Sequence, residues 1–201
     1  MDKIAIFGST GMTGTCALKA AIDKGLKIKV LVRDPSKIPE EFRPKVEVIH
    51  GDVLKYEDVL ETVKNVQSVV VVLGTRNNLK PTTDLSEGMK NIVRAMNETN
   101  IEVVSVCLSA FLFYEPSKVP PMFVDLNADH QRQLKVVLGS SLKYIAILPP
   151  HIADSPQTEY VVEVGKSPGR AVSKYDLGRF LVESLSEEKY YGRLCGIYSP
   201  Q

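Results

Sequence analysis

The sequence is poor in cysteine, nearly balanced in charge, and has no long apolar run at its N-terminus. The three cysteines, Cys16, Cys107 and Cys195, have no short spacing between them, which argues against a disulfide framework and against a zinc site. With 25 Lys and Arg against 24 Asp and Glu, the formal net charge of +1 gives no support for nucleic acid or a membrane surface as a partner. Because we find no signal peptide or transmembrane segment, we expect a cytoplasmic protein, and the cysteine pattern predicts no metal centre. We also expect the protein to act as a monomer.

The sequence does contain short β-rich runs that alternate with helical patterns. Most of the runs are continuously apolar, as expected for strands covered on both faces. The runs span 3–7, 27–32, 46–50, 68–73, 102–108 and 143–148, and the helical patterns span 12–24, 55–65, 84–98, 125–138 and 173–186. Ser173 and Asp176 resemble a capping box at the start of the last helix. The alternation predicts one α/β domain over 1–201, a Rossmann-like doubly wound parallel sheet with helices on both faces.

Two proline-containing stretches, at about 109–124 and 149–172, interrupt this alternation. Both follow predicted strands. Because such folds bind ligands beyond the carboxyl ends of their strands, we expect these stretches to be the substrate loops.

A glycine-rich segment, FGSTGMTG, directly follows the first predicted strand and opens the first helix. Gly8 permits a sharp turn, Gly11 lets the backbone approach a pyrophosphate, and Gly14 allows close packing of helix on sheet. The helix N-terminus presents free N–H groups to phosphates, and the hydroxyls of Thr10 and Thr13 add hydrogen bonds. The alternative is a purely structural turn, but the strand–loop–helix context favours a nucleotide site.

The segment LVRDPSK, at the end of the second predicted strand, bears on which nucleotide binds. A guanidinium such as that of Arg33 clamps a 2′-phosphate through paired charge-assisted bonds, and Ser36 and Lys37 lie nearby. NADP is therefore the predicted cofactor. Two alternatives stay open: a solvated charge run, and NAD binding through Asp34.

The next two predicted strands are followed by further candidate cofactor residues. After the third strand, Asp52 is a candidate acceptor for the adenine amino group, with the Val53 backbone beside it. After the fourth, Leu73 and Gly74 are expected beside the cofactor ribose, and Arg76 points toward the crevice.

The stretch LSAFLFYEPSK resembles the Ser, Tyr and Lys proton-relay set of short-chain dehydrogenases. That chemistry needs Tyr114 and Lys118 on one helical face, so that the ammonium lowers the phenol pKa. Pro116 lies between them and disfavours this helix, and the helical pattern at 125–138 contains no Tyr. We therefore predict Tyr114 as a wall of the substrate loop, and Ser109 as a catalytic candidate at the crevice.

Two histidines complete the candidates. His130 either faces the crevice or is a satisfied, half-buried histidine. His151 follows the sixth predicted strand, where the fold brings a loop against the nicotinamide, and it is either a proton donor or a loop histidine without chemistry.

Longer segments resemble a known family, the NADPH-dependent flavin reductases also called biliverdin-IXβ reductases, which are atypical members of the extended short-chain dehydrogenase group. The likeness rests on KIAIFGSTGMTG, VLVRD, GDVL, LGTRN, PTT, SEGMKNIV, SAF, KVPP, LKYIAILPPHI and SKYDLG. It implies hydride transfer from NADPH to flavins (FMN, FAD, riboflavin) and to biliverdin-IXβ-type tetrapyrroles, and hence a part in heme catabolism. Such flat, conjugated acceptors need little acid catalysis from the protein.

The resemblance also implies site residues. The implied cofactor positions are Gly8, Thr10, Gly11, Thr13, Arg33, Ser36, Lys37, Asp52, Val53, Leu73, Gly74, Ser109, His130, His151 and Ile152. Met12 in the glycine-rich segment and Arg76 after the fourth strand are two further candidate cofactor residues. The acceptor positions are Arg76, Phe111, Tyr114, Met122 and Phe123.

The chain departs from the family pattern at some positions. Lys37 and Met122 stand where that pattern has Arg, and Tyr114 where it has Trp. Cys107 matches the first of two cysteines linked to nitrosyl transfer, whereas Ser184 replaces the second, so that activity is not expected. Two rival functions stay open: an NADP-binding redox sensor without turnover, and another extended dehydrogenase or epimerase.

Overall fold

Parallel strands form the centre of this computed structural model, which describes residues 1–200. An eight-stranded sheet has the order β3-β2-β1-β4-β5-β6-β10-β8, and every neighbouring pair is parallel except β10 and β8. Its strands are β1 (Lys3–Phe7), β2 (Lys27–Val32), β3 (Val46–His50), β4 (Ser68–Val71), β5 (Val103–Cys107), β6 (Lys143–Leu148), β8 (Val161–Val164) and β10 (Arg193–Tyr198). The predicted Rossmann-like parallel sheet is thus confirmed.

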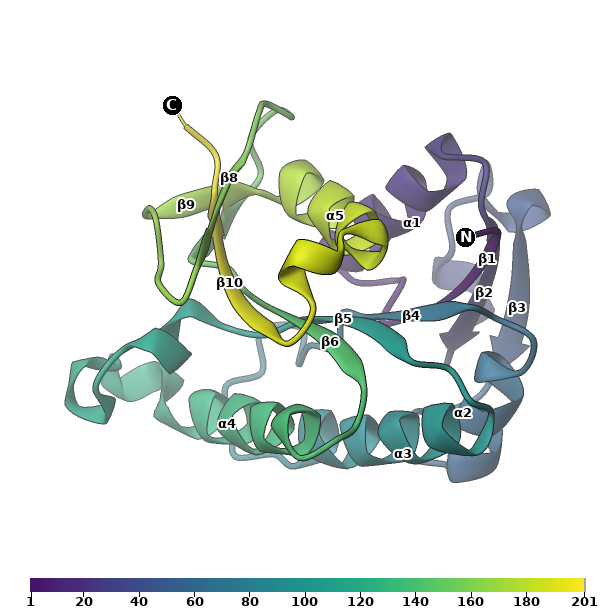
Figure 1. Ribbon diagram of the computed structural model, residues 1–201, viewed down its shortest axis with the longest axis horizontal. Helices are drawn as coiled ribbons and strands as arrows, with labels where there is room; N and C mark the ends of the chain where they lie inside the picture. Colours follow the sequence, from purple (N-terminus) through teal and green to yellow (C-terminus); the bar gives the residue numbers. More distant parts are fainter. Residues whose placement is uncertain (201) are drawn as a thin grey trace.

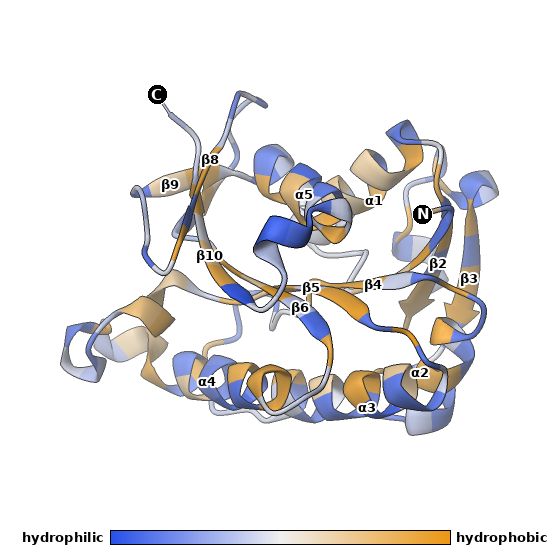
Figure 2. Cartoon of the chain, viewed as in Figure 1, coloured by the Kyte–Doolittle hydropathy of each residue, from blue (hydrophilic) through white to orange (hydrophobic). Residues whose placement is uncertain are grey.

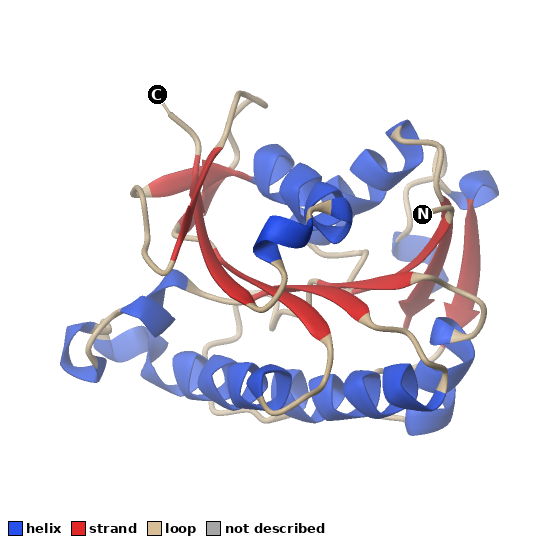
Figure 3. Ribbon diagram, in the orientation of Figure 1, coloured by secondary structure: helices blue, strands red, loops and turns tan. Residues whose placement is uncertain are grey.

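Helices cover both faces of this sheet (Figures 1 and 3). On one face lie α1 (Met12–Asp23) and α5 (Lys174–Glu183). On the other lie α2 (Tyr56–Val63), α3 (Asp84–Glu98) and α4 (Val124–Leu138). The five predicted helices are therefore present, with ends shifted by a few residues because capping and 3₁₀ turns decide where a helix stops.

Alternating residues of β1 supply two hydrophobic cores, one for each face. Ile4 and Ile6 belong to the cluster that contains Phe180 of α5, while Ala5 and Phe7 belong to the cluster that contains Met89 of α3. Figure 2 shows the central strands mostly in the hydrophobic colour. Burial of one such large side chain stabilises the fold by about 1.5–3 kcal/mol, which explains why the apolar runs mark these strands in the sequence.

The strand order reverses direction around β1, since β2 lies on one side of it and β4 on the other. The first crossover helix, α1, and the later helix α3 then cover opposite faces of the sheet. At such a switch point a crevice opens beyond the carboxyl ends of the strands, and the chain segments that leave β1 and β4 line it.

The region after β6 differs from the sequence prediction. The stretch 149–172 contains β7 (His151–Ala153), β8 and the first two residues of β9 (Ala171–Ser173), and β7 pairs with β9 in a small parallel sheet. β8 runs antiparallel to β10, so the sheet is not parallel throughout. These strands are three to six residues long and broken by polar residues or glycine, so they give no continuous apolar run.

A glycine explains how this region closes over the sheet edge. A Cβ at Gly196 of β10 would lie 2.0 Å from the carbonyl oxygen of Lys166. The backbone around residue 166 therefore passes directly over β10.

In the part of the chain that the structure describes, no helix is both long and apolar enough to span a lipid bilayer.

Candidate dinucleotide-binding crevice

The predicted cofactor residues cluster at one edge of the sheet. Because β1 to β6 are parallel, their carboxyl ends share this edge. The residues that follow these ends, in strand order, are Gly8, Arg33, Asp52, Leu73, Ser109 and His151.

The three positions of the glycine-rich loop after β1 are occupied by glycine for different structural reasons. Gly8 has a φ of 85°, and a Cβ on it would lie 2.1 Å from the carbonyl oxygen of Val72. A Cβ on Gly14 would lie 2.0 Å from the carbonyl oxygen of Gly8. At Gly11, by contrast, the nearest protein atom would be 3.5 Å away, an ordinary contact. Chain packing thus requires glycine at positions 8 and 14, whereas position 11 leaves an open surface for a ligand.

The N-terminus of α1 is suited to an anion. Gly11 is its N-cap, no side chain caps it, and its first turn contains no acidic residue. The N–H groups of the first turn are therefore available, and the helix dipole favours negative charge there. Thr13 is buried in this turn, Thr10 is partly buried before it, and Met12 is exposed. These features fit a bound pyrophosphate.

The loop after β4 reaches back to the glycine loop. Arg76 Nη2 donates a hydrogen bond to Thr10 Oγ1 at 3.1 Å. Arg76 and Asn77 both have left-handed backbone conformations, with φ values of 52° and 66°. At Gly74 an added Cβ would meet nothing within 4 Å, so no neighbour in the described chain requires glycine there. The predicted residues Thr10 and Arg76 are thus brought together.

The side chains at the end of β2 bear on the choice between NADP and NAD. The Asp34 carboxylate accepts hydrogen bonds from Ser36 N–H at 3.1 Å and Ser36 Oγ–H at 2.6 Å, and Lys37 Nζ lies 3.7 Å away. The Ser36 bonds, more than the lysine, hold the pKa of Asp34 below its ordinary value. Within residues 1–200, the exposed Arg33 side chain makes no hydrogen bond or ion pair. This arrangement suits a 2′-phosphate better than a ribose diol.

The carboxylate of Asp52 takes part in the turn that leads into α2. It accepts a hydrogen bond from Leu54 N–H at 3.0 Å, while the Asp58 carboxylate accepts one from Asp52 N–H at 2.9 Å. Asp58 also fills the space beside Gly51, where a Cβ would lie 2.5 Å from Asp58 Oδ2. Sequence reasoning missed Asp58, which fixes the backbone of the predicted adenine contact.

Val53 and Leu73 lie together against α3 because that helix has a glycine where they meet. A Cβ on Gly88 would lie 2.9 Å from Val53 Cγ1 and 3.2 Å from Leu73 Cδ1. Asn91 Nδ2 then donates to the Val53 carbonyl oxygen at 2.9 Å. The prediction missed Gly88 and Asn91, although a glycine within an otherwise regular helical pattern was the available signal.

The loop after β5 gathers aromatic side chains next to Ser109. The Ser109 hydroxyl accepts a hydrogen bond from Phe111 N–H at 3.3 Å and so caps a short 3₁₀ turn. The Phe111 ring lies 6.0 Å from that of Tyr114 and 5.3 Å from that of Phe123, measured between centroids. Three of the predicted acceptor residues thus form one cluster, while the Met122 side chain is exposed.

Tyr114 and Lys118 do not share a helical face. Glu115 between them has a non-helical ψ of 138°, and Lys118 belongs to a separate 3₁₀ turn, Pro116–Lys118. The prediction that Tyr114 and Lys118 do not form the i,i+4 helical pair of a proton relay is confirmed.

A groove of about 450 Å³ adjoins the aromatic cluster. Phe113 and Tyr114 line one side, and a glycine-rich turn with Lys166 and Arg170 lines the other. Lys166 pairs with Glu163 at 2.6 Å, whereas Arg170 has no ion-pair partner in the described chain. Sequence reasoning missed both basic residues, because their approach to Tyr114 depends on how the turn crosses β10.

Comparison with known proteins agrees with this geometry. A family model described as NAD(P)H-binding matches residues 8–188. The chain belongs to this NAD(P)H-binding family. The predicted nicotinamide cofactor is thereby confirmed.

Three related proteins give the degree of similarity. Eugenol synthase 1 of Petunia hybrida is 24% identical over 226 residues, covering 100% of this chain and 70% of that protein. A Rossmann-fold NAD(P)-binding protein of Shigella flexneri superposes with a TM-score of 0.80 at 22% identity, over 100% of this chain and 94% of the other. A short-chain dehydrogenase/reductase of Veillonella parvula in complex with NADP gives 0.79 at 19% identity, over 99% and 95%. At such identities the structural likeness establishes the fold.

For an NAD(P)H-binding chain, the two candidate histidines differ in exposure. His130 is 9% exposed, its Nδ1 lies 3.2 Å from Gln133 Oε1, and burial lowers its pKa. The alternative of a satisfied histidine therefore describes His130 better than a side chain exposed to the crevice. His151 is exposed at the start of β7, followed by the half-buried Ile152.

Burial raises the pKa values of all three cysteine thiols. All three cysteines are buried, and burial raises the pKa of Cys107 to about 12. Among residues 1–200, no three His, Cys, Asp or Glu side chains form a group that could hold a metal ion.

Proposed function

We propose that the protein is an NADPH-dependent oxidoreductase that reduces flat, conjugated acceptors, namely flavins (FMN, FAD, riboflavin) and biliverdin-IXβ-type tetrapyrroles. The observation that carries this proposal is the aromatic cluster of Phe111, Tyr114 and Phe123 directly beside Ser109. Aromatic walls of this kind suit a planar ring system, which gains from stacking and offset contacts.

The preference for NADPH rests on Arg33. Its guanidinium is exposed and has no partner in the described chain, while the neighbouring Asp34 is engaged by Ser36. A planar guanidinium holds a phosphate through paired charge-assisted bonds. Lys37 adds a second positive charge at the same strand end.

When bound, NADPH supplies the hydride from its nicotinamide ring. The chain binds and orients the acceptor. Phe111 and Tyr114 restrict it to a plane, and Arg170 with Lys166 offers positive charge to an anionic tail such as a phosphate or propionate. The two catalytic candidates are Ser109, whose hydroxyl can orient a polar group, and His151, which is exposed and can hold or deliver a proton.

The absence of a Tyr-Lys relay in residues 1–200 fits acceptors of this type. A conjugated ring spreads incoming negative charge, so it does not need a strong protein acid at a single oxygen. An alcohol-forming carbonyl reductase would need one. We also propose that the chain acts as a monomer in the cytoplasm.

The test follows NADPH absorbance with the purified protein and FMN or biliverdin-IXβ, and with NADP⁺ and a panel of secondary alcohols as the control. NADPH oxidation with either planar acceptor, and no reduction of NADP⁺ by the alcohols, supports the proposal. Tight NADPH binding without oxidation favours a redox sensor. Turnover of alcohols alone favours a dehydrogenase.

A further inference from the structure

The segment 154–160, which follows β7, is attached to the start of α5 by several polar side chains. Ser173 Oγ donates to the Ser155 carbonyl oxygen at 2.8 Å. Lys174 Nζ pairs with Asp154 Oδ1 at 2.7 Å. These side chains belong to the stretch SKYDLGR, which opens α5.

A buried carboxylate lies at the centre of these contacts. Asp176 is 0% exposed. It accepts hydrogen bonds from Thr158 N–H at 3.0 Å, Thr158 Oγ1–H at 3.0 Å and Ser199 Oγ–H at 2.6 Å. Ser199 Oγ in turn accepts from Ser173 N–H at 2.9 Å. Asp176 thus joins the segment 154–160, the start of α5 and the C-terminal end of β10.

This arrangement corrects the capping-box prediction. Ser173 does cap α5, since its Oγ accepts a hydrogen bond from Tyr175 N–H at 3.2 Å. Asp176, however, does not bond back to Ser173 N–H, because Ser199 occupies that position. The Asp176 carboxylate accepts its hydrogen bonds from Thr158 and Ser199 instead, so it does not cap the helix.

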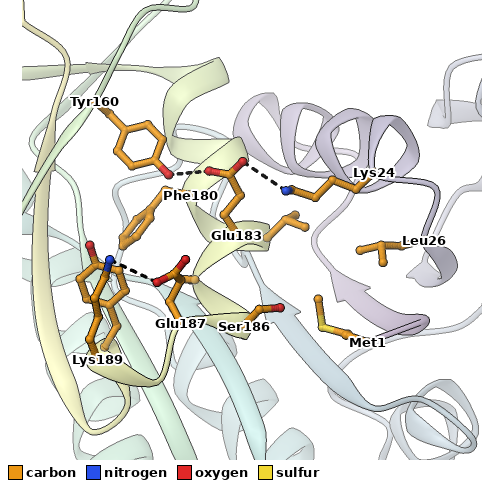
Figure 4. A pocket seen from close by; sticks show the side chains of 12 residues that line it. Met1, Lys24, Leu26, Tyr160, Phe180, Glu183, Ser186, Glu187 and Lys189 are labelled. Carbon is orange, nitrogen blue, oxygen red and sulfur yellow. Dashed lines mark hydrogen bonds and ion pairs between the residues drawn. The ribbon is translucent and has the colours of Figure 1, made fainter.

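The far end of the segment is also held. Arg179 Nη2 donates to the Thr158 carbonyl oxygen at 3.1 Å, and the Tyr160 hydroxyl donates to Glu183 Oε2 at 2.6 Å. Figure 4 shows Tyr160 pointing toward Glu183, which also pairs with Lys24, the C-cap residue of α1. Residues 154–160 are therefore fixed to α5 at both ends, with Asp176 between them.

The same contacts bear on the candidate site. In the small sheet, His151 pairs with Ala171, and Ala153 pairs with Ser173. Ser173 is thus a strand partner of β7, the cap of α5 and a neighbour of Ser199. Any shift of the segment 154–160 against α5 would move β7, and with it His151 and Ile152.

We propose that Asp176 is a positioning residue, which fixes β7 so that His151 and Ile152 meet the nicotinamide half of the cofactor. This inference rests on the proposed function only for the placement of those two residues. Asp176 itself touches neither cofactor nor acceptor. It acts through Thr158, which lies in the segment after β7, and through Ser199, which accepts a hydrogen bond from Ser173 N–H in β9, the strand partner of β7.

The test compares Asp176→Asn with the wild-type chain by isothermal titration with two ligands, NADPH and adenosine 2′,5′-bisphosphate. The second ligand contains only the adenosine half with its 2′-phosphate, which the glycine loop and Arg33 would hold. We expect NADPH affinity to fall about 10-fold, because a carboxamide cannot accept all three hydrogen bonds, while affinity for the bisphosphate stays within about twofold. Amide hydrogen exchange at Thr158 and Ile152 should become faster.

Milder variants keep the inference testable if Asp176→Asn does not fold. Ser199→Ala and Thr158→Val each remove one of the bonds to Asp176 and should weaken NADPH about threefold. Thr158→Ser, which keeps the hydroxyl, should retain wild-type affinity. Ser105→Ala is the matched control, because it removes a buried hydrogen bond from β5 to the Leu181 carbonyl oxygen of α5 and touches none of Asp176, Thr158 and Ser199. It should lower Tm without changing NADPH affinity.

Two results overturn the inference. One is unchanged NADPH affinity in the Asp176 and Ser199 variants. The other is an equal loss for NADPH and the bisphosphate, which indicates general loss of structure. Both results concern binding, so they remain decisive even if no acceptor is reduced, and the failure of the proposed function stays distinguishable from the failure of this inference.

Discussion

The backbone N–H of Ala110 donates a hydrogen bond to the carbonyl oxygen of Pro149 at 2.9 Å. This bond joins the segment after β5 to the segment after β6, at the carboxyl edge of the sheet. Ser109 precedes the donor and His151 lies two residues beyond the acceptor. The two catalytic candidates therefore belong to adjoining segments, one with the aromatic cluster and the other with the small sheet.

Replacement of Arg33 by alanine should raise KM for NADPH about 10- to 100-fold, since charge-assisted hydrogen bonds contribute about 1.5–3 kcal/mol each. NADH has no 2′-phosphate, so its KM should change little. Steady-state kinetics with both cofactors measures the difference, and Arg33→Lys should fall between, because an ammonium lacks the bidentate geometry. Equal losses for NADPH and NADH would remove Arg33 from this role.

Two glycine variants should separate packing from ligand binding. Gly14→Ala places a Cβ against the Gly8 carbonyl oxygen and should lower Tm by about 10 °C. Gly11→Ala fits the chain, so Tm should stay close to wild type, whereas NADPH affinity should fall about 10-fold or more because the methyl group faces the ligand. Thermal unfolding and titration calorimetry measure the two effects. A Gly11 variant with normal NADPH affinity would contradict the predicted pyrophosphate site.

Tyr114→Phe should retain most of kcat with FMN, because Tyr114 is expected to contribute its ring rather than its hydroxyl. Its side chain is 44% exposed and lies in edge contact with Phe111. Tyr114→Ala, which removes the ring, should mainly raise KM for the acceptor by about 10-fold. A fall of several orders of magnitude in kcat for the phenylalanine variant would instead identify Tyr114 as an acid.

The burial of His130 predicts a pH dependence of stability. Burial holds the pKa of this histidine below its ordinary value of 6.5. The unfolded chain therefore takes up the proton first as pH falls, so the stabilisation present above about pH 6.5 is lost progressively toward the lower pKa of the folded state. His130→Gln should show a smaller decline of Tm between about pH 7.5 and pH 5.5. An identical decline in both proteins would show that His130 does not cause it.

The sequence was sufficient where apolar runs and glycine spacing encode the structure. The first six strands, the five helices and the turn at Gly8 are of this kind, because burial of apolar side chains and a left-handed φ restrict the residue choice. The groove at Lys166 and Arg170 was not predictable, since it requires the turn to cross β10 at Gly196. The bonds between Asp176 and Thr158 were equally hidden, because the two residues are far apart on different elements.

The most direct test of the account uses NADPH that carries deuterium at the transferable position of its nicotinamide ring, with biliverdin-IXβ as acceptor. Direct hydride transfer to a planar acceptor predicts a bilirubin product with one deuterium at its central bridging carbon, detected by mass spectrometry and NMR. A product without deuterium, or intact NADPH after prolonged incubation with both biliverdin and FMN, would contradict the proposed reaction.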